Sequence, residues 1–94
     1  MRKMTNEERT MVLAGLEMNV VSEEGFVVNF EGTSFTGSLI GNDECFDTEG
    51  FYHFLVTNDT LYKCYYNYKE LELDEIDYTN PMAVEEVHFE DYID

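Results

Sequence analysis

Basic residues are scarce in this sequence. It contains five Lys and Arg residues against 21 Asp and Glu residues, which gives a formal net charge of −16 over 94 residues. A protein that binds nucleic acid needs a basic patch or track to neutralise phosphates, and the sequence offers none. We therefore expect no direct binding to DNA or RNA, and we expect such an excess of one charge, which repels itself in the folded state, to have a functional reason.

Cysteine is also scarce, and the sequence carries no recognisable metal motif. Cys45 and Cys64 stand alone rather than in a closely spaced Cys or His set, which predicts two free thiols and no zinc site. The acidic stretch 41–50 fails the EF-hand pattern, because Cys45 and Val56 would occupy its first and last ligand positions. We expect no metal and no other cofactor, and we interpret this stretch as an acidic, solvated loop.

Catalytic signatures are missing as well. There is no glycine-rich phosphate loop and no nucleophile elbow. Glu85 and His88 have the Glu-x-x-His spacing of a di-iron helix, but that site needs a second such motif and two further glutamates from a four-helix bundle. His53 lies within an aromatic stretch, where a core histidine is more common than a catalytic base. The sequence predicts that the protein is not an enzyme, and a small enzyme or metal protein is the weakest alternative.

Long hydrophobic runs are absent. No stretch approaches the ~20 apolar residues of a membrane span. The basic start MRKMTNEER leads into a polar helix start rather than into the apolar run of a signal peptide. We expect a cytoplasmic protein that does not associate with membranes.

Apolar and aromatic residues are nevertheless plentiful, at 44% and 15% of the chain. Acidic disordered tails are poor in such residues, and a chain of this length rarely divides into two domains. The sequence therefore predicts one folded domain over residues 1–94.

The N-terminal half has local signals for one helix and two strands. Thr5 followed by Glu8 is a capping box, and the apolar spacing after it predicts a helix over 6–18. Alternation around residues 26–30 predicts a strand. A turn at 31–33 then leads to a second strand over 34–40, with a bend at Gly37.

The aromatic stretches 51–56 and 61–68 flank the polar residues 57–60, which predicts a β-hairpin. The second stretch carries Tyr62, Tyr66 and Tyr68 on one face, as bases would need for stacking. Only two lysines lie nearby, so core and protein-contact roles are favoured over a nucleic-acid platform.

The segment 70–94 contains ten carboxylates and no Lys or Arg. Leu71 and Leu73 alternate with acids, which predicts a strand with an acidic open face, continued past a β-bulge at 74–75. For 81–92 a closing helix is the first choice, because Asn80 and Pro81 suit its start, and a strand is the alternative. The expected class is α+β: an N-terminal helix, an antiparallel sheet of about four to five strands and a short C-terminal helix.

Small, strongly acidic, single-domain chains of this kind resemble the phage-encoded DNA mimics and anti-CRISPR inhibitors, a resemblance of size and charge over the whole chain. It implies an inhibitor that occupies the nucleic-acid channel of a basic nuclease or CRISPR effector by presenting carboxylates in place of phosphates. The alternative is an immunity protein or antitoxin that neutralises a basic nuclease toxin. The predicted principal partner-binding row is Glu70, Glu72, Asp74, Glu75 and Asp77. The predicted secondary acids are Glu85, Glu86, Glu90 and Asp91.

Overall fold

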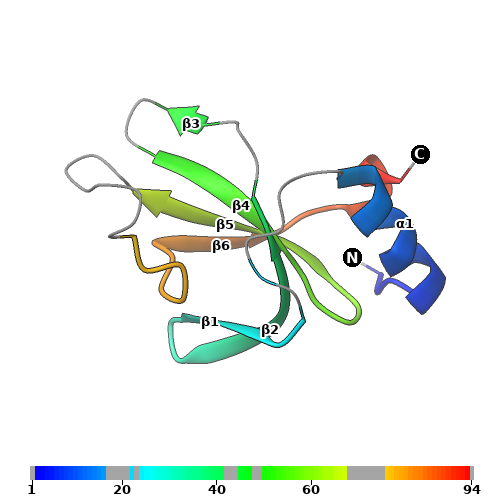
Figure 1. Ribbon diagram of the computed structural model, residues 1–94, viewed down its shortest axis with the longest axis horizontal. Coiled ribbons are helices and arrows are strands. Elements are labelled where there is room, and N and C mark those ends of the chain that lie inside the picture. Colours follow the sequence, from blue (N-terminus) through cyan, green and yellow to red (C-terminus); the bar gives the residue numbers. More distant parts are fainter. Residues whose placement is uncertain are drawn as a thin grey trace.

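The structure is a computed structural model that describes residues 2–16, 22, 24–41, 45–47, 50–67 and 76–93, with the backbone alone for 45–47. Its elements follow one another along the chain as shown in Figure 1. They are α1 (Asn6–Leu16), β1 (Phe26–Phe30), β2 (Thr33–Ile40), β3 (Cys45–Asp47), β4 (Gly50–Val56), β5 (Leu61–Asn67), β6 (Ala83–Glu86) and the 3-10 helix η2 (Phe89–Tyr92). The α+β class is confirmed.

The helix α1 begins where the capping box places it. The Glu8 amide donates to Thr5 Oγ1 at 3.2 Å, and the Thr5 amide donates to the Glu8 carboxylate at 2.9 Å. These reciprocal bonds satisfy amide groups that the first turn of a helix leaves without partners. The described helix ends at Leu16, so the last two residues of the predicted helix lie outside the described residues.

The centre of the sheet is the predicted hairpin. β4 and β5 pair antiparallel from Gly50 with Asn67 to Val56 with Leu61, and Thr57 closes the turn by donating to the Thr60 carbonyl at 3.0 Å. The sheet order is β1-β2-β4-β5-β6. In addition, β3 pairs with the first residues of β4, whereas β2 pairs with its last residues. Residues of the hairpin alternate between two faces, since successive strand side chains point to opposite sides.

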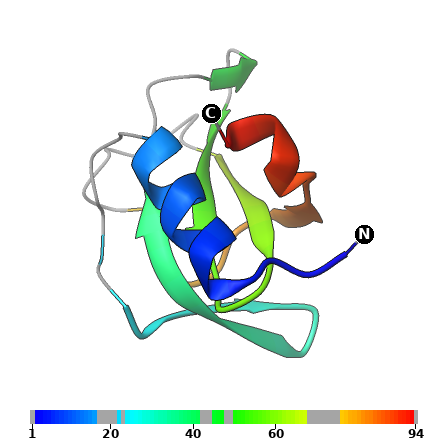
Figure 2. The same ribbon diagram turned by 90° about the vertical axis from the view of Figure 1, so that its right-hand side faces the viewer.

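We name the two faces of the sheet by what covers them. The helix face carries Phe54, Val56 and Leu61, which pack against Val12 and Leu16 of α1 and against Phe89 of η2. α1 and η2 lie side by side at one end of the sheet (Figures 1 and 2). They pack so closely that a Cβ on Gly15 would collide with the Tyr92 carbonyl oxygen.

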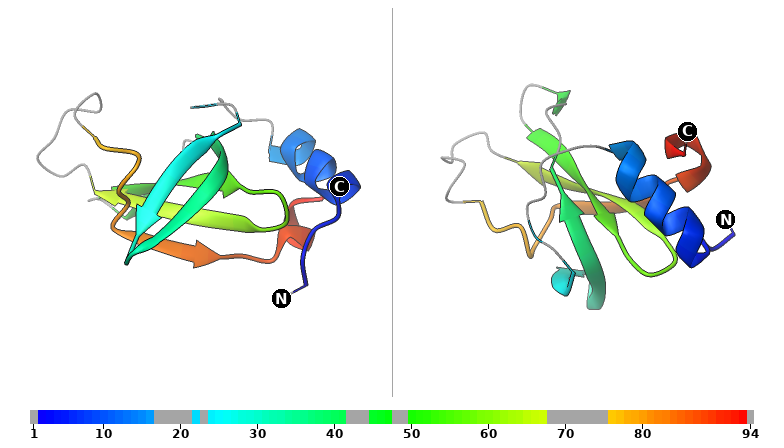
Figure 3. Two further views of the ribbon diagram at one scale, coloured as in Figure 1. Left: turned by 90° about the horizontal axis from the view of Figure 1, so that it is seen from below. Right: turned by 45° about the vertical axis from the view of Figure 1, so that its right-hand side comes forward.

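The opposite face of the sheet is covered by the antiparallel hairpin of β1 and β2, and we call it the hairpin face. Its core joins Leu55, Cys64 and Tyr66 of the central hairpin to Val28 and Leu39, which come from the covering strands. Figure 3 shows β1 and β2 crossing over the central strands.

β2 reaches both layers by changing partner at the predicted bend. Gly37 pairs with Phe26 of β1, whereas the next residue, Ser38, pairs with Val56 of β4. A Cβ on Gly37 would collide with the main chain of Val56 and Thr57, so only glycine fits this crossing.

The prediction of a helix over 81–92 is wrong for residues 83–86. Residues Ala83–Glu86 form the strand β6, flanked by bonds from the Met82 amide to the Tyr65 carbonyl and from the Val87 amide to the Leu61 carbonyl. The reason is tertiary: β5 offers an edge whose main-chain groups need partners. The short C-terminal helix is confirmed as the single 3-10 turn η2.

Two further segments differ from the sequence analysis. The loop predicted over 41–50 contains the short strand β3, which pairs with the start of β4. The predicted acidic strand lies mostly outside the described residues, and its described end is no strand: Ile76 and Asp77 precede a turn at Tyr78 and Thr79. There the Asp77 carboxylate accepts bonds from the Thr79 amide at 3.0 Å and from the Asn80 side chain at 2.7 Å, which stabilises the turn.

Candidate partner-binding surface

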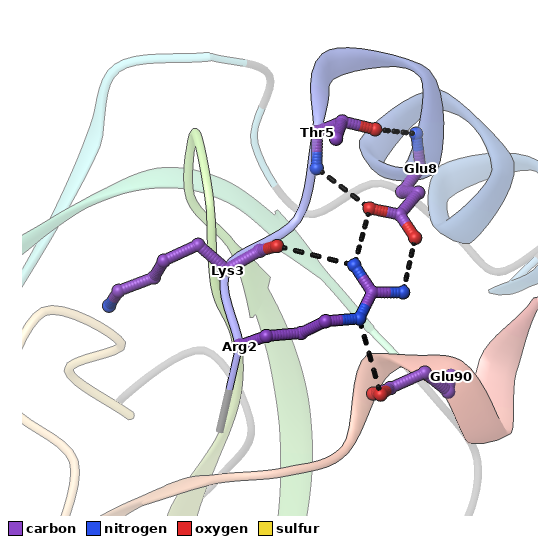
Figure 4. A network of polar contacts seen from close by, with 5 residues as sticks. All are labelled: Arg2, Lys3, Thr5, Glu8 and Glu90. Carbon is purple, nitrogen blue, oxygen red and sulfur yellow. Dashed lines mark hydrogen bonds and ion pairs between the residues drawn. The ribbon is translucent and has the colours of Figure 1, made fainter.

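Arg2 joins the N-terminal segment to α1 and η2 (Figure 4). Its guanidinium donates to both carboxylate oxygens of Glu8, at 2.9 and 2.6 Å, and lies 3.8 Å from the Glu90 carboxylate. It also stacks over the Phe89 ring, 4.7 Å from the ring centroid. The hydrogen bond from Arg2 lowers the pKa of Glu8 to about 2, with help from the Thr5 amide.

The other cations near the N-terminus hold α1 to the β4–β5 turn. Arg9 Nε donates to the Thr57 carbonyl at 3.1 Å, and Lys3 Nζ donates to Thr60 Oγ1 at 3.2 Å. The Met4 amide adds a bond of 2.7 Å to the Asp59 carbonyl. These contacts fix the helix against one end of the sheet.

Lys63 is the last cation among the described residues, and it also makes a contact within the protein. Its ammonium group is 4.5 Å from the centroid of the Tyr52 ring, within the range of a cation–π contact. Every Lys and Arg in the described part of the chain therefore makes an intramolecular contact, and the ion pairs of Arg2 and Arg9 engage three described carboxylates, those of Glu8, Glu24 and Glu90.

Several acids correspondingly lack internal partners. In the ranges that the structure describes, the carboxylates of Glu7, Glu31, Glu86 and Asp91 make no ion pair and no side-chain hydrogen bond. Carboxylates of this kind are available to a basic partner without the loss of an internal contact.

The structure places the predicted partner-binding acids as follows. Glu70, Glu72, Asp74 and Glu75 lie outside the described residues. Asp77 is exposed in its turn, and the remaining four lie on β6 and η2.

The four acids of β6 and η2 do not form one row. Glu85 stands on the helix face opposite Lys63, whereas Glu86 stands on the hairpin face opposite Tyr62. Glu90 and Asp91 belong to η2, where Glu90 contacts Arg2. Any partner that meets all four must therefore contact both faces of the sheet at its β6 side.

The sequence analysis missed a half-buried group of tyrosines on the helix face, here called the tyrosine patch: Tyr52, Tyr65 and Tyr92. The rings of Tyr52 and Tyr65 lie 5.8 Å apart, and Tyr92 packs on Phe54 at 5.1 Å. Tyr65 donates to the Glu85 carboxylate at 2.9 Å, and burial together with this carboxylate raises the pKa of Tyr65 to about 12. Tyrosine is enriched among the residues that contribute most to binding at protein interfaces.

The tyrosines on the other face of β5 belong to the core. Tyr66 is buried, and its hydroxyl donates to the Tyr78 carbonyl at 2.9 Å. Tyr62 packs edge-on against Phe35, with ring centroids 4.9 Å apart. The preference for core tyrosines over a base-stacking platform is thus confirmed for these two, and Tyr68 lies outside the described residues.

His53 and Cys64 are buried structural groups. The His53 ring stacks on Tyr78 at 5.3 Å, with Nδ1 3.2 Å from the Tyr52 carbonyl, and burial lowers its pKa. Burial raises the pKa of the Cys64 thiol to about 12, so this free cysteine stays protonated. Within the described ranges, no three His, Cys, Asp or Glu side chains gather in a way that could hold a metal ion.

The buried imidazole predicts a pH dependence of stability. Because folding lowers the pKa of His53 below its ordinary value of 6.5, His53 disfavours folding once pH falls below that value, and the unfavourable contribution grows until pH reaches the folded pKa. We expect His53→Phe to reduce the loss of unfolding free energy between about pH 7.5 and pH 5.5, measured by urea denaturation. A variant with the same pH slope as the parent protein would contradict this assignment.

Comparison of the chain with protein-family models, with curated proteins and with solved structures finds no match. No helix in the described ranges has the length and apolar character to span a bilayer. Function is therefore inferred from the surface itself.

Proposed function

We propose that this protein is an inhibitor that binds a basic nucleic-acid-binding protein, such as a nuclease or a CRISPR effector, and occludes its nucleic-acid channel. The observation that carries the proposal is the distribution of charge. Every cation of the described residues makes a contact within the fold, whereas the described carboxylates of Glu7, Glu31, Glu86 and Asp91 have no internal partner, on a chain with a formal net charge of −16. Opposite fields of this size accelerate association with a basic surface.

The tyrosine patch suits the centre of such a contact. Its rings offer apolar area that loses little conformational freedom on binding, and Glu85 stands beside them with its carboxylate exposed. The acids Glu90 and Asp91 of η2 lie next to Tyr92 in the chain. We assign Glu70, Glu72, Asp74, Glu75 and Asp77 as the principal charged contact, with Glu85, Glu86, Glu90 and Asp91 as the secondary one.

Competition with nucleic acid tests the proposal. Purified nucleases and CRISPR effectors are loaded with fluorescent DNA or guide-bound target, and the protein is titrated in while anisotropy reports release of the DNA. We expect release by this protein at concentrations at which poly-glutamate of equal total charge has no effect, because only a folded surface matches the channel. Binding that leaves the DNA in place would contradict occlusion and would favour an immunity protein that acts away from the channel.

The uncompensated charge predicts that salt stabilises the isolated protein. Screening shortens the range of repulsion to about 10 Å at 0.1 M salt, so carboxylates farther apart cease to destabilise the fold. We expect the thermal midpoint, followed by circular dichroism, to rise as NaCl increases from about 20 to 200 mM. A midpoint that falls would show that ion pairs such as Arg2 with Glu8 outweigh the repulsion.

The same charge predicts that the protein does not bind nucleic acids by itself. Each polyanion would meet a negative field, and every cation in the described ranges is already engaged. Anisotropy titration with single-stranded and double-stranded DNA and with RNA should show no binding at low salt. Salt-sensitive binding to any of them would exclude the mimic and would point to aromatic stacking instead.

A further inference from the structure

At the ends of the strand order, one edge of the sheet is covered and the other has no further strand among the described residues. At the β1 edge the Asn29 amide donates to the Thr79 carbonyl at 2.8 Å, so the turn after Asp77 occupies that edge. β6 is the last strand at the other end, and no described segment pairs with its outer side.

The register shows which main-chain groups of β6 point outward. The Val87 amide donates to the Leu61 carbonyl at 3.0 Å and continues the register in which Glu85 faces Lys63, so within β6 inward-pointing residues alternate with outward-pointing ones. The bond from the Met82 amide to the Tyr65 carbonyl lies before Ala83, where this alternation begins. Glu85 therefore points its amide and carbonyl toward β5, whereas Val84 and Glu86 point theirs away from the sheet. Among the described residues β6 pairs with β5 alone, so no described strand lies along its outer side.

The side chains along this edge favour a pairing strand that carries positive charge. Glu85 and Glu86 project from opposite faces, and β6 contains no Lys or Arg. Met82, immediately before β6, is 55% exposed and offers apolar contact. A second copy of this chain would place glutamates against glutamates, which is unfavourable for neighbouring strands and protects the edge from self-association.

We propose that the β6 edge accepts an extended, basic segment of the partner protein as an additional strand. Main-chain bonds to Val84 and Glu86 would supply affinity, as in other cases of strand addition. Successive basic side chains of the added strand would then alternate between Glu85 with Tyr65 on the helix face and Glu86 on the hairpin face. The inference rests on the proposed function only in that the partner is basic, and it specifies how the partner is held.

Two synthetic peptides test the edge on the intact protein by calorimetry at low salt. The first is a ten-residue peptide that repeats Lys-Lys-Thr-Thr, so that neighbouring lysines point to opposite faces of the added strand. The second has the same sequence with N-methyl groups on its four central residues, which removes strand-forming amides and keeps the charge. We expect the methylated peptide to bind at least about tenfold more weakly, because charge alone remains to hold it.

A pair of variants tests the same edge from the protein side. Glu86→Pro removes the outward amide and one charge, whereas Glu86→Gln removes the charge alone; proline is tolerated on an edge where the amide faces solvent. We expect the proline variant to bind the unmethylated peptide about tenfold more weakly and the glutamine variant to stay within about threefold of the parent protein. Circular dichroism checks both folds, and if the proline variant does not fold, the peptide comparison on the parent protein decides.

The outcomes separate the edge from the proposed function. Equal binding of both peptides would overturn strand addition and leave the basic partner standing. Binding of neither peptide would overturn strand addition together with the attraction to basic partners on which the proposed function depends. Concentration-dependent dimerisation that Glu86→Pro abolishes, seen by sedimentation, would overturn the inference by assigning the edge to a second copy.

Discussion

Reversal of Glu70, Glu72 and Asp74 to lysine is expected to abolish most of the inhibition while leaving the protein folded. Each substitution changes the charge by two units, so the net charge falls from −16 to −10 and self-repulsion decreases. At the interface the lysines would face a basic channel, where like charges cost several kcal/mol. The partner's affinity should therefore fall by at least about a hundredfold, through slower association and faster release. Affinity is measured against the partner that the competition assay identifies.

A second triple variant separates the site from the total charge. Glu7→Lys, Glu24→Lys and Glu31→Lys also brings the net charge to −10, but these acids lie on α1 and in the turns beside β1. We expect this variant to keep most of the affinity. Equal losses in both variants would mean that only bulk charge matters. Undiminished inhibition by the first variant would move the site to the acids between Asp43 and Glu49.

Replacement of Gly37 by alanine is expected to give the largest loss of stability of any single methyl addition in β2. The new Cβ would collide with main-chain atoms of Val56 and Thr57, and a strand backbone cannot move as the end of a flexible side chain can. Relief would require β2 to separate from β4 where it changes partner. We expect a loss of about 3 kcal/mol in unfolding free energy, from urea denaturation.

The neighbouring Thr36→Ala variant is the control for Gly37. Thr36 is exposed in the same strand and pairs with Val27, so its truncation should change stability by less than about 1 kcal/mol. A Gly37→Ala variant as stable as this control would show that β2 does not pass so close to β4.

The parts of the fold that the sequence predicted are those determined by neighbouring residues. The capping box needs only Thr5 and Glu8, three positions apart, and it sets the first residue of α1. The central hairpin needs two aromatic stretches and a short polar turn, and its register follows from the turn. The buried positions of Cys64 and Tyr66 then follow from strand alternation.

The parts that the sequence did not predict depend on distant segments. Asn80 and Pro81 suit a helix start, but residues 83–86 lie along β5, and a strand there also gives partners to the main-chain groups of β5, whereas a short helix without tertiary packing is only marginally stable. The tyrosine patch stays half exposed because α1 and η2 cover only one end of the helix face. How far a helix extends over a sheet cannot be inferred from the periodicity of either element.

The arrangement of two cores on one sheet has a consequence for how the molecule opens. Phe54 and Leu55 are adjacent in β4, yet they belong to the cores on opposite faces, and Leu61 and Cys64 divide β5 in the same way. Neither layer can come away without exposing strands that the other layer needs. Opening should thus be cooperative, with the central amides exchanging with solvent only when the whole domain unfolds. A strand bound beside β6 would slow exchange throughout the sheet, because the partner would be stabilising one indivisible unit.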